Sequence, residues 1–210
     1  MRFLTDGPDD GFATILLAHG AGAPMDSPAM NALAAALAQA CMRVVRFEFG
    51  YMAARREGAR RPPPRADLLL GEYRKAVDEL GAAGPLIIGG KSMGGRVASM
   101  VADDLHARGA VAGLLCLGYP FHPPGKPEQP RTAHLAALKT PTLICQGTRD
   151  PFGTPGDVAS YPLSGSIEML WLEDGDHDLK PRKRISGHSA ADHLSTMARR
   201  VEAWARRVIG

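Results

Sequence analysis

Residues 84–95 read Gly-Pro-Leu-Ile-Ile-Gly-Gly-Lys-Ser-Met-Gly-Gly, a stretch in which a short apolar run gives way to glycines around one serine. The run at 86–88 is typical of a buried strand. After the last glycine, apolar residues recur at helical spacing: Val97, Ala98, Val101 and Leu105. The stretch therefore predicts a buried strand, a tight turn with Ser92 at its apex, and a helix.

The residues Gly90-Lys91-Ser92-Met93-Gly94 fit the pattern G-x-S-x-G, which in a strand–turn–helix context is typical of a nucleophile elbow. A turn this sharp strains the backbone of the serine and leaves room only for small neighbours, which the flanking glycines supply. The serine oxygen would then lie at the N-terminus of a helix, whose dipole favours developing negative charge. The pattern alone also fits an idle serine in a glycine-rich turn.

Gly-Lys-Ser is also the end of the phosphate-binding pattern G-x-x-x-x-G-K-[ST]. That pattern needs its first glycine at position 85, where the chain has Pro85. It also needs a phosphate-cradling loop where the apolar run stands. The sequence therefore disfavours nucleotide binding at this site.

Composition is that of an ordinary globular chain, and we expect one domain spanning residues 1–210. The net charge of +3 is too small to indicate nucleic acid, and no apolar stretch is long enough for a signal peptide or a membrane span. We therefore expect neither a nucleic-acid nor a membrane partner, while the oligomeric state is left open. An odd number of cysteines in or beside apolar runs favours reduced, buried thiols and a cytoplasmic location. These cysteines are Cys41, Cys116 and Cys145.

Apolar runs alternate with helical patterns about six times along the chain. Continuous runs, rather than an alternation of period two, are typical of a parallel sheet that is covered on both faces. We expect an α/β fold with a mostly parallel sheet of about six strands, helices on both faces, and irregular loops at 50–65 and 118–128. The runs lie at 13–18, 43–49, 86–88, 110–117, 142–146 and 166–172, and helical patterns lie at 28–37, 69–80, 97–105, 132–138 and 189–208.

Three polar residues follow separate predicted strands in the order Ser92, Asp150, His177. The carboxyl ends of parallel strands meet at one edge of a sheet, so we expect these side chains to converge. Serine is a weak nucleophile that needs a base to take its proton and a carboxylate to orient that base. The order Ser, Asp, His is the one used by α/β-hydrolases. Asp157 is an alternative acid, but it lies further along the loop in a predicted short helix.

The first predicted strand ends in His19-Gly20-Ala21-Gly22. Small residues at this point would let a substrate carbonyl approach the backbone. The amide of Ala21, with that of Gly22 as the alternative, is the candidate oxyanion donor. His19 could be a base, although we favour a structural role in which its ring bonds to nearby backbone.

Other polar residues near these positions have competing interpretations. Tyr119, Phe121 and His122 either flank an acyl pocket or simply pack in a proline-rich loop, with equal weight. The basic stretches at 55–65 and 180–184 fit a solvated surface better than a device that steers anionic substrates. Asp174, Asp176, His177 and Asp178 could bind a metal, but adjacent residues seldom converge on one ion, and the three aspartates fit surface charges of a loop better. His188 and His193 lie at or near the start of the last predicted helix and are expected in solvent.

Three stretches, Gly-Lys-Ser-Met-Gly-Gly-Arg, His-Gly-Ala-Gly and Pro-Phe-His-Pro-Pro-Gly-Lys-Pro-Glu, support a resemblance that covers nearly the whole chain. The chain resembles the α/β-hydrolase superfamily in its small, lid-less, dienelactone-hydrolase-like form. More narrowly it looks like a branch with testis-expressed proteins and a subunit of a chromatin acetyltransferase (NSL) complex. The chain departs from this pattern in two ways. Little room before residue 13 implies a shortened sheet, and serine stands where dienelactone hydrolases proper have cysteine.

The resemblance implies roles for the residues named above. Ser92 would be the nucleophile, His177 the base and Asp150 the orienting acid, with the amides of Met93 and Ala21 as the oxyanion hole. We therefore expect a serine hydrolase that cleaves a small ester or thioester and needs no metal or organic cofactor. The alternatives are a catalytically silent scaffold with a hydrolase fold, and an acyltransferase that uses the same site.

Overall fold

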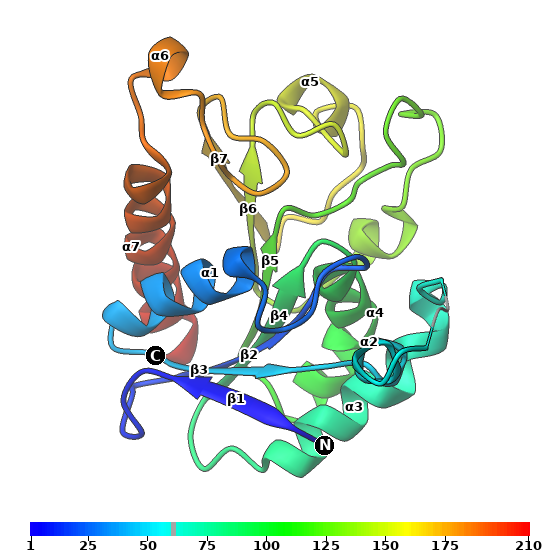
Figure 1. Cartoon of the computed structure of the whole chain (residues 1–210), viewed down its shortest axis with the longest axis vertical. Helices are drawn as coiled ribbons and strands as arrows, with labels where there is room; N and C mark the ends of the chain where they lie inside the picture. Colours follow the sequence, from blue (N-terminus) through cyan, green and yellow to red (C-terminus); the bar gives the residue numbers. More distant parts are fainter. Residues whose placement is uncertain (60–61) are drawn as a thin grey trace.

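The computed structural model describes residues 1–59 and 62–210, and within them seven strands form one sheet (Figure 1). The order across the sheet is β1-β3-β2-β4-β5-β6-β7, and β1 alone is antiparallel to its neighbour. The mostly parallel sheet expected from the continuous apolar runs is therefore confirmed. The strands are β1 (Phe3–Asp6), β2 (Thr14–Ala18), β3 (Arg43–Phe47), β4 (Leu86–Lys91), β5 (Gly113–Leu117), β6 (Thr142–Gly147) and β7 (Ile167–Leu172).

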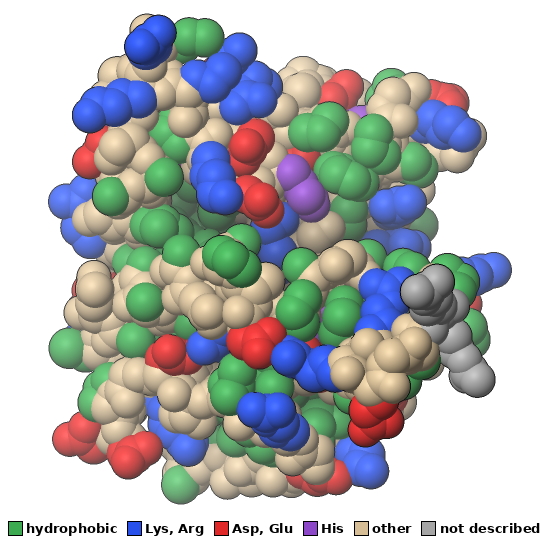
Figure 2. Space-filling view, in the orientation of Figure 1, with side chains coloured by type: hydrophobic (Ala, Val, Ile, Leu, Met, Phe, Trp, Pro, Cys, Tyr) green, Lys and Arg blue, Asp and Glu red, His purple; other side chains and the backbone are tan. Residues whose placement is uncertain are grey.

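Helices cover both faces of this sheet, as the sequence predicts. On one face α1 (Pro28–Gln39) packs beside α7 (Ala190–Ile209), and on the other α3 (Leu70–Leu80) packs beside α4 (Met93–Ala107) (Figure 1). Figure 2 shows a hollow near the centre of the surface, with a histidine and charged side chains around it. Short helical segments lie in the connections: α2 (Gly50–Arg56), η1 (Ala66–Leu69), η2 (Ala133–Ala137), α5 (Pro155–Val158) and α6 (Lys183–Ser186).

Local sequence signals fix where the long helices begin and end. Ser27 caps α1, with its side chain accepting a hydrogen bond from the amide of Met30, and Pro28 follows as the first helical residue. Ser189 caps α7 in a capping box with Asp192. Gly81 ends α3 in the left-handed region, with φ of 52°. These boundaries agree with those that the sequence predicts.

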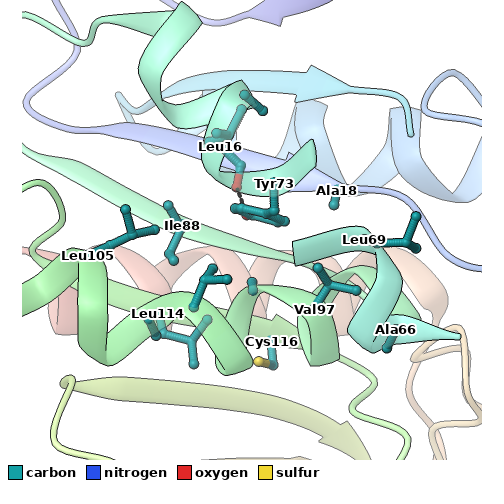
Figure 3. Close-up of a cluster of buried hydrophobic side chains, with 14 of the residues drawn as sticks. Leu16, Ala18, Ala66, Leu69, Tyr73, Ile88, Val97, Leu105, Leu114 and Cys116 are labelled. Carbon is teal, nitrogen blue, oxygen red and sulfur yellow. Dashed lines mark hydrogen bonds between the residues drawn. The ribbon is translucent and has the colours of Figure 1, made fainter. Parts of the chain in front are cut away.

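The sheet separates two apolar cores. Successive side chains of a strand point to opposite faces, so Leu16 and Ile88 join the core beneath α3 and α4 while their strand neighbours join the other core. In the first core the buried Tyr73 hydroxyl lies 3.1 Å from the carbonyl oxygen of Leu16 (Figure 3). It also lies 2.7 Å from the carbonyl oxygen of Gly89. The amide of Gly89 donates back to this hydroxyl at 2.8 Å. One side chain from α3 thus ties together β2 and β4, the strand that precedes Ser92.

Three features differ from the expectations. The sheet gains β1, which is only four residues long and partly buried at the edge, and therefore lacks a long apolar run. The stretch at 50–65 contains α2, because burial of Tyr51 and Met52 stabilises a helix that has no amphipathic period of its own. Cys41 is exposed, whereas the other two cysteines are buried as expected. Arg60 and Arg61 lie outside the described residues.

No helix within residues 1–59 and 62–210 has both the length and the apolar character that crossing a membrane requires.

Candidate active site

The turn after β4 has the geometry of a nucleophile elbow. Ser92 has φ of 52° and ψ of −116°, a strained conformation for a residue with a side chain. A Cβ on Gly94 would lie 2.4 Å from the carbonyl oxygen of Ala18, and one on Gly90 would lie 2.6 Å from the same oxygen. Both glycines are therefore required for β4 and α4 to meet against β2. The predicted strand, turn and helix are confirmed.

The structure brings Ser92, Asp150 and His177 together, each from the loop after a separate strand. Nε2 of His177 lies 2.9 Å from Oγ of Ser92, and Nδ1 lies 2.8 Å from Oδ2 of Asp150. A carboxylate only accepts hydrogen bonds, so Nδ1 carries a proton and donates it to Asp150. In the neutral imidazole, Nε2 is then free to accept the serine proton. This arrangement can activate the serine hydroxyl as a nucleophile.

Gln146, at the end of β6, holds the buried Asp150 in place. Its Nε2 donates to Oδ2 of Asp150 at 2.9 Å, and its Oε1 accepts from the amide of Tyr119 at 2.7 Å. The amide of Phe152 donates to the other carboxylate oxygen at 2.9 Å. Our sequence reasoning did not assign Gln146 a role. The one signal was a polar side chain inside an apolar strand.

Phe152 also packs on the imidazole, with 4.3 Å between the ring centroids of Phe152 and His177. This contact fixes the orientation of the ring between its two hydrogen bonds.

Lys91, the residue before the serine, is buried and forms an ion pair with Asp178, the residue after His177. Nζ of Lys91 lies 3.4 Å from Oδ1 of Asp178. Burial lowers the pKa of the Lys91 ammonium, while Asp178 and Asp150 act in the opposite direction. The pair links the elbow to the loop that carries His177. The ammonium group of Lys91 therefore lies beside Ser92 and His177 and is not exposed to solvent.

Two cavities meet at Ser92. The first has a volume of about 290 Å³ and includes His177 in its wall. The second has a volume of about 410 Å³ and includes Met93 in its wall. Ala21, Ser92 and Phe152 line both.

The candidate oxyanion donors lie at this junction. The Met93 amide is at the N-terminus of α4, where the first N–H groups of a helix have no intrahelical partner. Among the described residues no hydrogen bond reaches the amide of Ala21 or of Met93. Gly22, the alternative donor, lines the first cavity only.

His19 is a structural residue, as the sequence favours. The amide of Phe49 donates to its Nε2 at 3.2 Å, so Nδ1 carries the proton and donates to the carbonyl oxygen of Gly20 at 2.7 Å. Burial lowers the pKa of the His19 imidazole, which agrees with a neutral ring. His19 therefore joins the loops after β2 and β3 and sets the backbone path at Ala21.

The structure places Tyr119, Phe121 and His122 behind the cavity wall instead of on it. All three side chains are buried, and from this stretch Pro120 reaches the second cavity. The Tyr119 hydroxyl donates to the carbonyl oxygen of Arg131 at 3.1 Å. The geometry thus favours the packing interpretation, because these side chains are buried and line neither cavity.

The alternative acidic residues and histidines have other partners. Asp157 sits in the capping box of α5, away from His177. Asp174 pairs with Arg149 and Arg182. His193, expected in solvent, is instead buried, with Nδ1 bonded to the carbonyl oxygen of Leu179 at 2.9 Å.

Residues of the basic stretches also have local partners. Arg56 pairs with Glu48 and Asp26, and Arg65 with Asp67.

Fold and site together define a class. The chain has a strained serine after β4 that is hydrogen-bonded through a histidine to a buried carboxylate, and these residues lie on a mostly parallel sheet covered on both faces. This is the arrangement of the α/β serine hydrolases. The chain belongs to the alpha/beta hydrolase domain family, whose sequence pattern it matches over residues 11–206.

Solved structures of similar fold include enzymes of this class. A dienelactone hydrolase from Anabaena variabilis is 20% identical, with a TM-score of 0.72 over 99% of this chain and 92% of that one. A serine hydrolase without a lid from Xanthomonas campestris is 18% identical, with a TM-score of 0.69 over 99% of this chain and 88% of that one. An esterase domain from Rhodothermus marinus is 17% identical, with a TM-score of 0.67 over 100% of both chains. At these identities the likeness shows the fold.

Proposed function

We propose that this protein is a serine hydrolase that cleaves a small carboxylic ester or thioester through an acyl-enzyme on Ser92. The observation that carries the proposal is the hydrogen-bonded line from Ser92 through His177 to the buried Asp150. The strained elbow and the two cavities at Ser92 support it further. A serine in an idle turn would need neither a base nor an oriented carboxylate.

In the proposed reaction, Oγ of Ser92 bonds to the substrate carbonyl carbon as its proton passes to Nε2 of His177. The amides of Ala21 and Met93 donate hydrogen bonds to the oxyanion. The bond between the carbonyl carbon and the leaving oxygen or sulfur breaks, and the leaving group takes the proton from His177. Water then attacks the acyl-enzyme with His177 as base, the acid departs, and Ser92 regains its proton.

A fluorophosphonate probe, which reacts with activated serines, tests this proposal. We expect the wild type to be labelled and Ser92→Ala to be unlabelled, with both variants folded by circular dichroism. Ser99→Ala is the matched control, because Ser99 also touches a histidine, with 2.8 Å to Nε2 of His134, but lines neither cavity. A folded wild type that never labels, or equal labelling of Ser92→Ala, would overturn the proposal.

Finer features of the proposal rest on the sequence. The kinship with testis-expressed and chromatin-complex proteins is supported by the three stretches quoted above. A cytoplasmic location is supported by three free cysteines. Hydrolysis assays with an ester, thioester and amide panel would identify the preferred bond.

A further inference from the structure

The two cavities at Ser92 differ in the charge of their walls. The first contains one lysine, Lys91, which is already paired with Asp178. Among the described residues, the second is lined by three arginines and a single carboxylate: Arg65, Arg96, Arg131 and Asp67. The second cavity therefore carries an excess of positive charge beside the nucleophile.

Arg96 and Arg131 are the cations of this wall that have no acidic partner among the described residues. Arg65 and Asp67 are exposed and pair with each other at 3.1 Å. Within residues 1–59 and 62–210, the guanidinium groups of Arg96 and Arg131 form no ion pair or hydrogen bond, and Nε of Arg96 is buried without a partner. Burial and the neighbouring Arg96 both lower the pKa of the Arg131 guanidinium. Two half-buried cations side by side lack the counter-charge that such groups normally have in proteins.

Both arginines are held by defined structure. Arg96 lies one helical turn after the nucleophile, and its amide donates to the carbonyl oxygen of Ser92 at 3.1 Å. Arg131 is fixed on both sides of its backbone. Its amide donates to the carbonyl oxygen of Phe121 at 2.7 Å, and its own carbonyl oxygen accepts from the Tyr119 hydroxyl. The buried aromatic residues behind the wall thus position a charged residue on it.

The location of His177 assigns the two cavities to the two parts of an ester. His177 and Asp178 line the first cavity and are absent from the wall of the second. Because His177 must give its proton to the leaving group, the leaving group occupies the first cavity. The acyl group then extends into the second cavity, past Met93 toward Arg96.

We propose that the second cavity is an anion-binding acyl pocket, and that the preferred substrate is an ester or thioester whose acyl group carries a carboxylate, as in a half-ester of a short dicarboxylic acid. Arg96 and Arg131 donate charge-assisted hydrogen bonds to that carboxylate. The inference deepens the proposed function and rests on the assignment of Ser92 as the nucleophile.

Three phenyl-type esters test the proposal on the wild type. Phenyl pentanoate is the neutral reference, the monophenyl ester of glutaric acid replaces its terminal methyl with a carboxylate, and 3-carboxyphenyl pentanoate carries the charge on the leaving group. We expect kcat/KM for the glutarate half-ester to exceed that for phenyl pentanoate by about tenfold or more. We expect no such gain for 3-carboxyphenyl pentanoate. Equal values for the first two esters, or an equal gain from a charge on either side, would overturn the proposal.

Substitutions locate the preference. Arg96→Gln and Arg131→Gln should each lower kcat/KM for the half-ester by about tenfold while changing that for phenyl pentanoate less than about threefold. Arg184→Gln removes the same charge from an exposed position on α6 and should retain the preference. A parallel loss on both esters, or an equal effect of Arg184→Gln, would contradict the assignment.

A binding measurement separates this inference from the proposed function. Calorimetry on Ser92→Ala should show tighter binding of the glutarate half-ester than of phenyl pentanoate, and Ser92→Ala/Arg131→Gln should lose the difference. Differential binding by a protein that neither labels nor hydrolyses would sustain the anion pocket and overturn the proposed function. Hydrolysis and labelling without differential binding would overturn the anion pocket and sustain the proposed function.

Discussion

Replacing Gln146 with methionine tests how the buried Asp150 is held. Gln146 is fully buried, accepts a hydrogen bond from the Tyr119 amide at 2.7 Å and donates one to Asp150 at 2.9 Å. Methionine has a similar length and fills a similar volume, but it can replace neither bond. Gln146→Met therefore leaves a buried N–H without a partner and weakens the support of a buried carboxylate.

The minimum cost follows from these two losses, to which is added the loss of the hydrogen bond from the Gln146 side-chain amide nitrogen to the carbonyl oxygen of Tyr119 at 3.2 Å. An unpaired buried N–H costs about 1–3 kcal/mol, and a hydrogen bond to a charged group contributes about 1.5–3 kcal/mol. Together they predict that the free energy of unfolding falls by about 3 kcal/mol or more. For a chain of 210 residues, a loss of that size lowers the melting temperature by roughly 6–12 °C.

Urea and thermal unfolding, followed by circular dichroism, would measure this change. Gln39→Met is the matched control, because Gln39 is exposed at the end of α1, and its free energy of unfolding should change by less than about 0.5 kcal/mol. A loss below about 1 kcal/mol in Gln146→Met would refute the reasoning, since the hydrogen bonds of Gln146 would then contribute little to stability.

Further predictions concern the elbow, the pH dependence of stability and the ion pair behind the site. Gly94→Ala places a carbon 2.4 Å from a backbone oxygen of β2 and should abolish soluble expression. Gly22→Ala meets no described residue within 4 Å and should fold, and a soluble, probe-labelled Gly94→Ala would contradict this prediction. Burial raises the pKa of the Asp103 carboxyl, but hydrogen bonds from the segment before β6 outweigh it and hold the pKa below the ordinary value. Asp103→Asn should therefore destabilise the protein to urea at pH 7, and the difference should shrink below about pH 4 as the wild-type carboxyl takes up a proton; a pH-independent difference would argue against it. Lys91→Met and Asp178→Asn should each lower kcat/KM several-fold, and the double variant should lower it no further than the more damaging single substitution, because the two residues act as a pair. Additive losses of kcat/KM would show that the residues act separately.

The geometry of the candidate site depends on where strands end. Ser92, Asp150 and His177 each follow an apolar run, and parallel strands bring such positions to one edge of the sheet. Their meeting could therefore be predicted from the chain order alone. Gln146 and the pairing of Lys91 could not, because the partners of a buried polar side chain depend on loop paths that no local pattern fixes.

The same limit applies to the fold. Strands with long apolar runs and helices with caps were predictable, because their signals lie within a few consecutive residues. β1 is too short and too exposed for such a run, and α2 depends on burial of Tyr51 against the rest of the protein. Neither the exposure of Cys41 nor the inward packing of Phe121 is encoded locally, since both depend on which elements are neighbours in space.

The position of β7 has a consequence for how activity depends on folding. β7 pairs with β6 alone, at the edge of the described sheet, and the loop that follows it carries His177. Ser92 and its elbow can be complete while this edge is still unpaired, during synthesis or in a local opening of the native chain. Local unfolding of β7 would then separate His177 from Ser92 while the two apolar cores remain folded. Under the proposed function, catalytic competence would therefore report on the integrity of the C-terminal edge of the sheet, and hydrolysis would require the last strand to have docked.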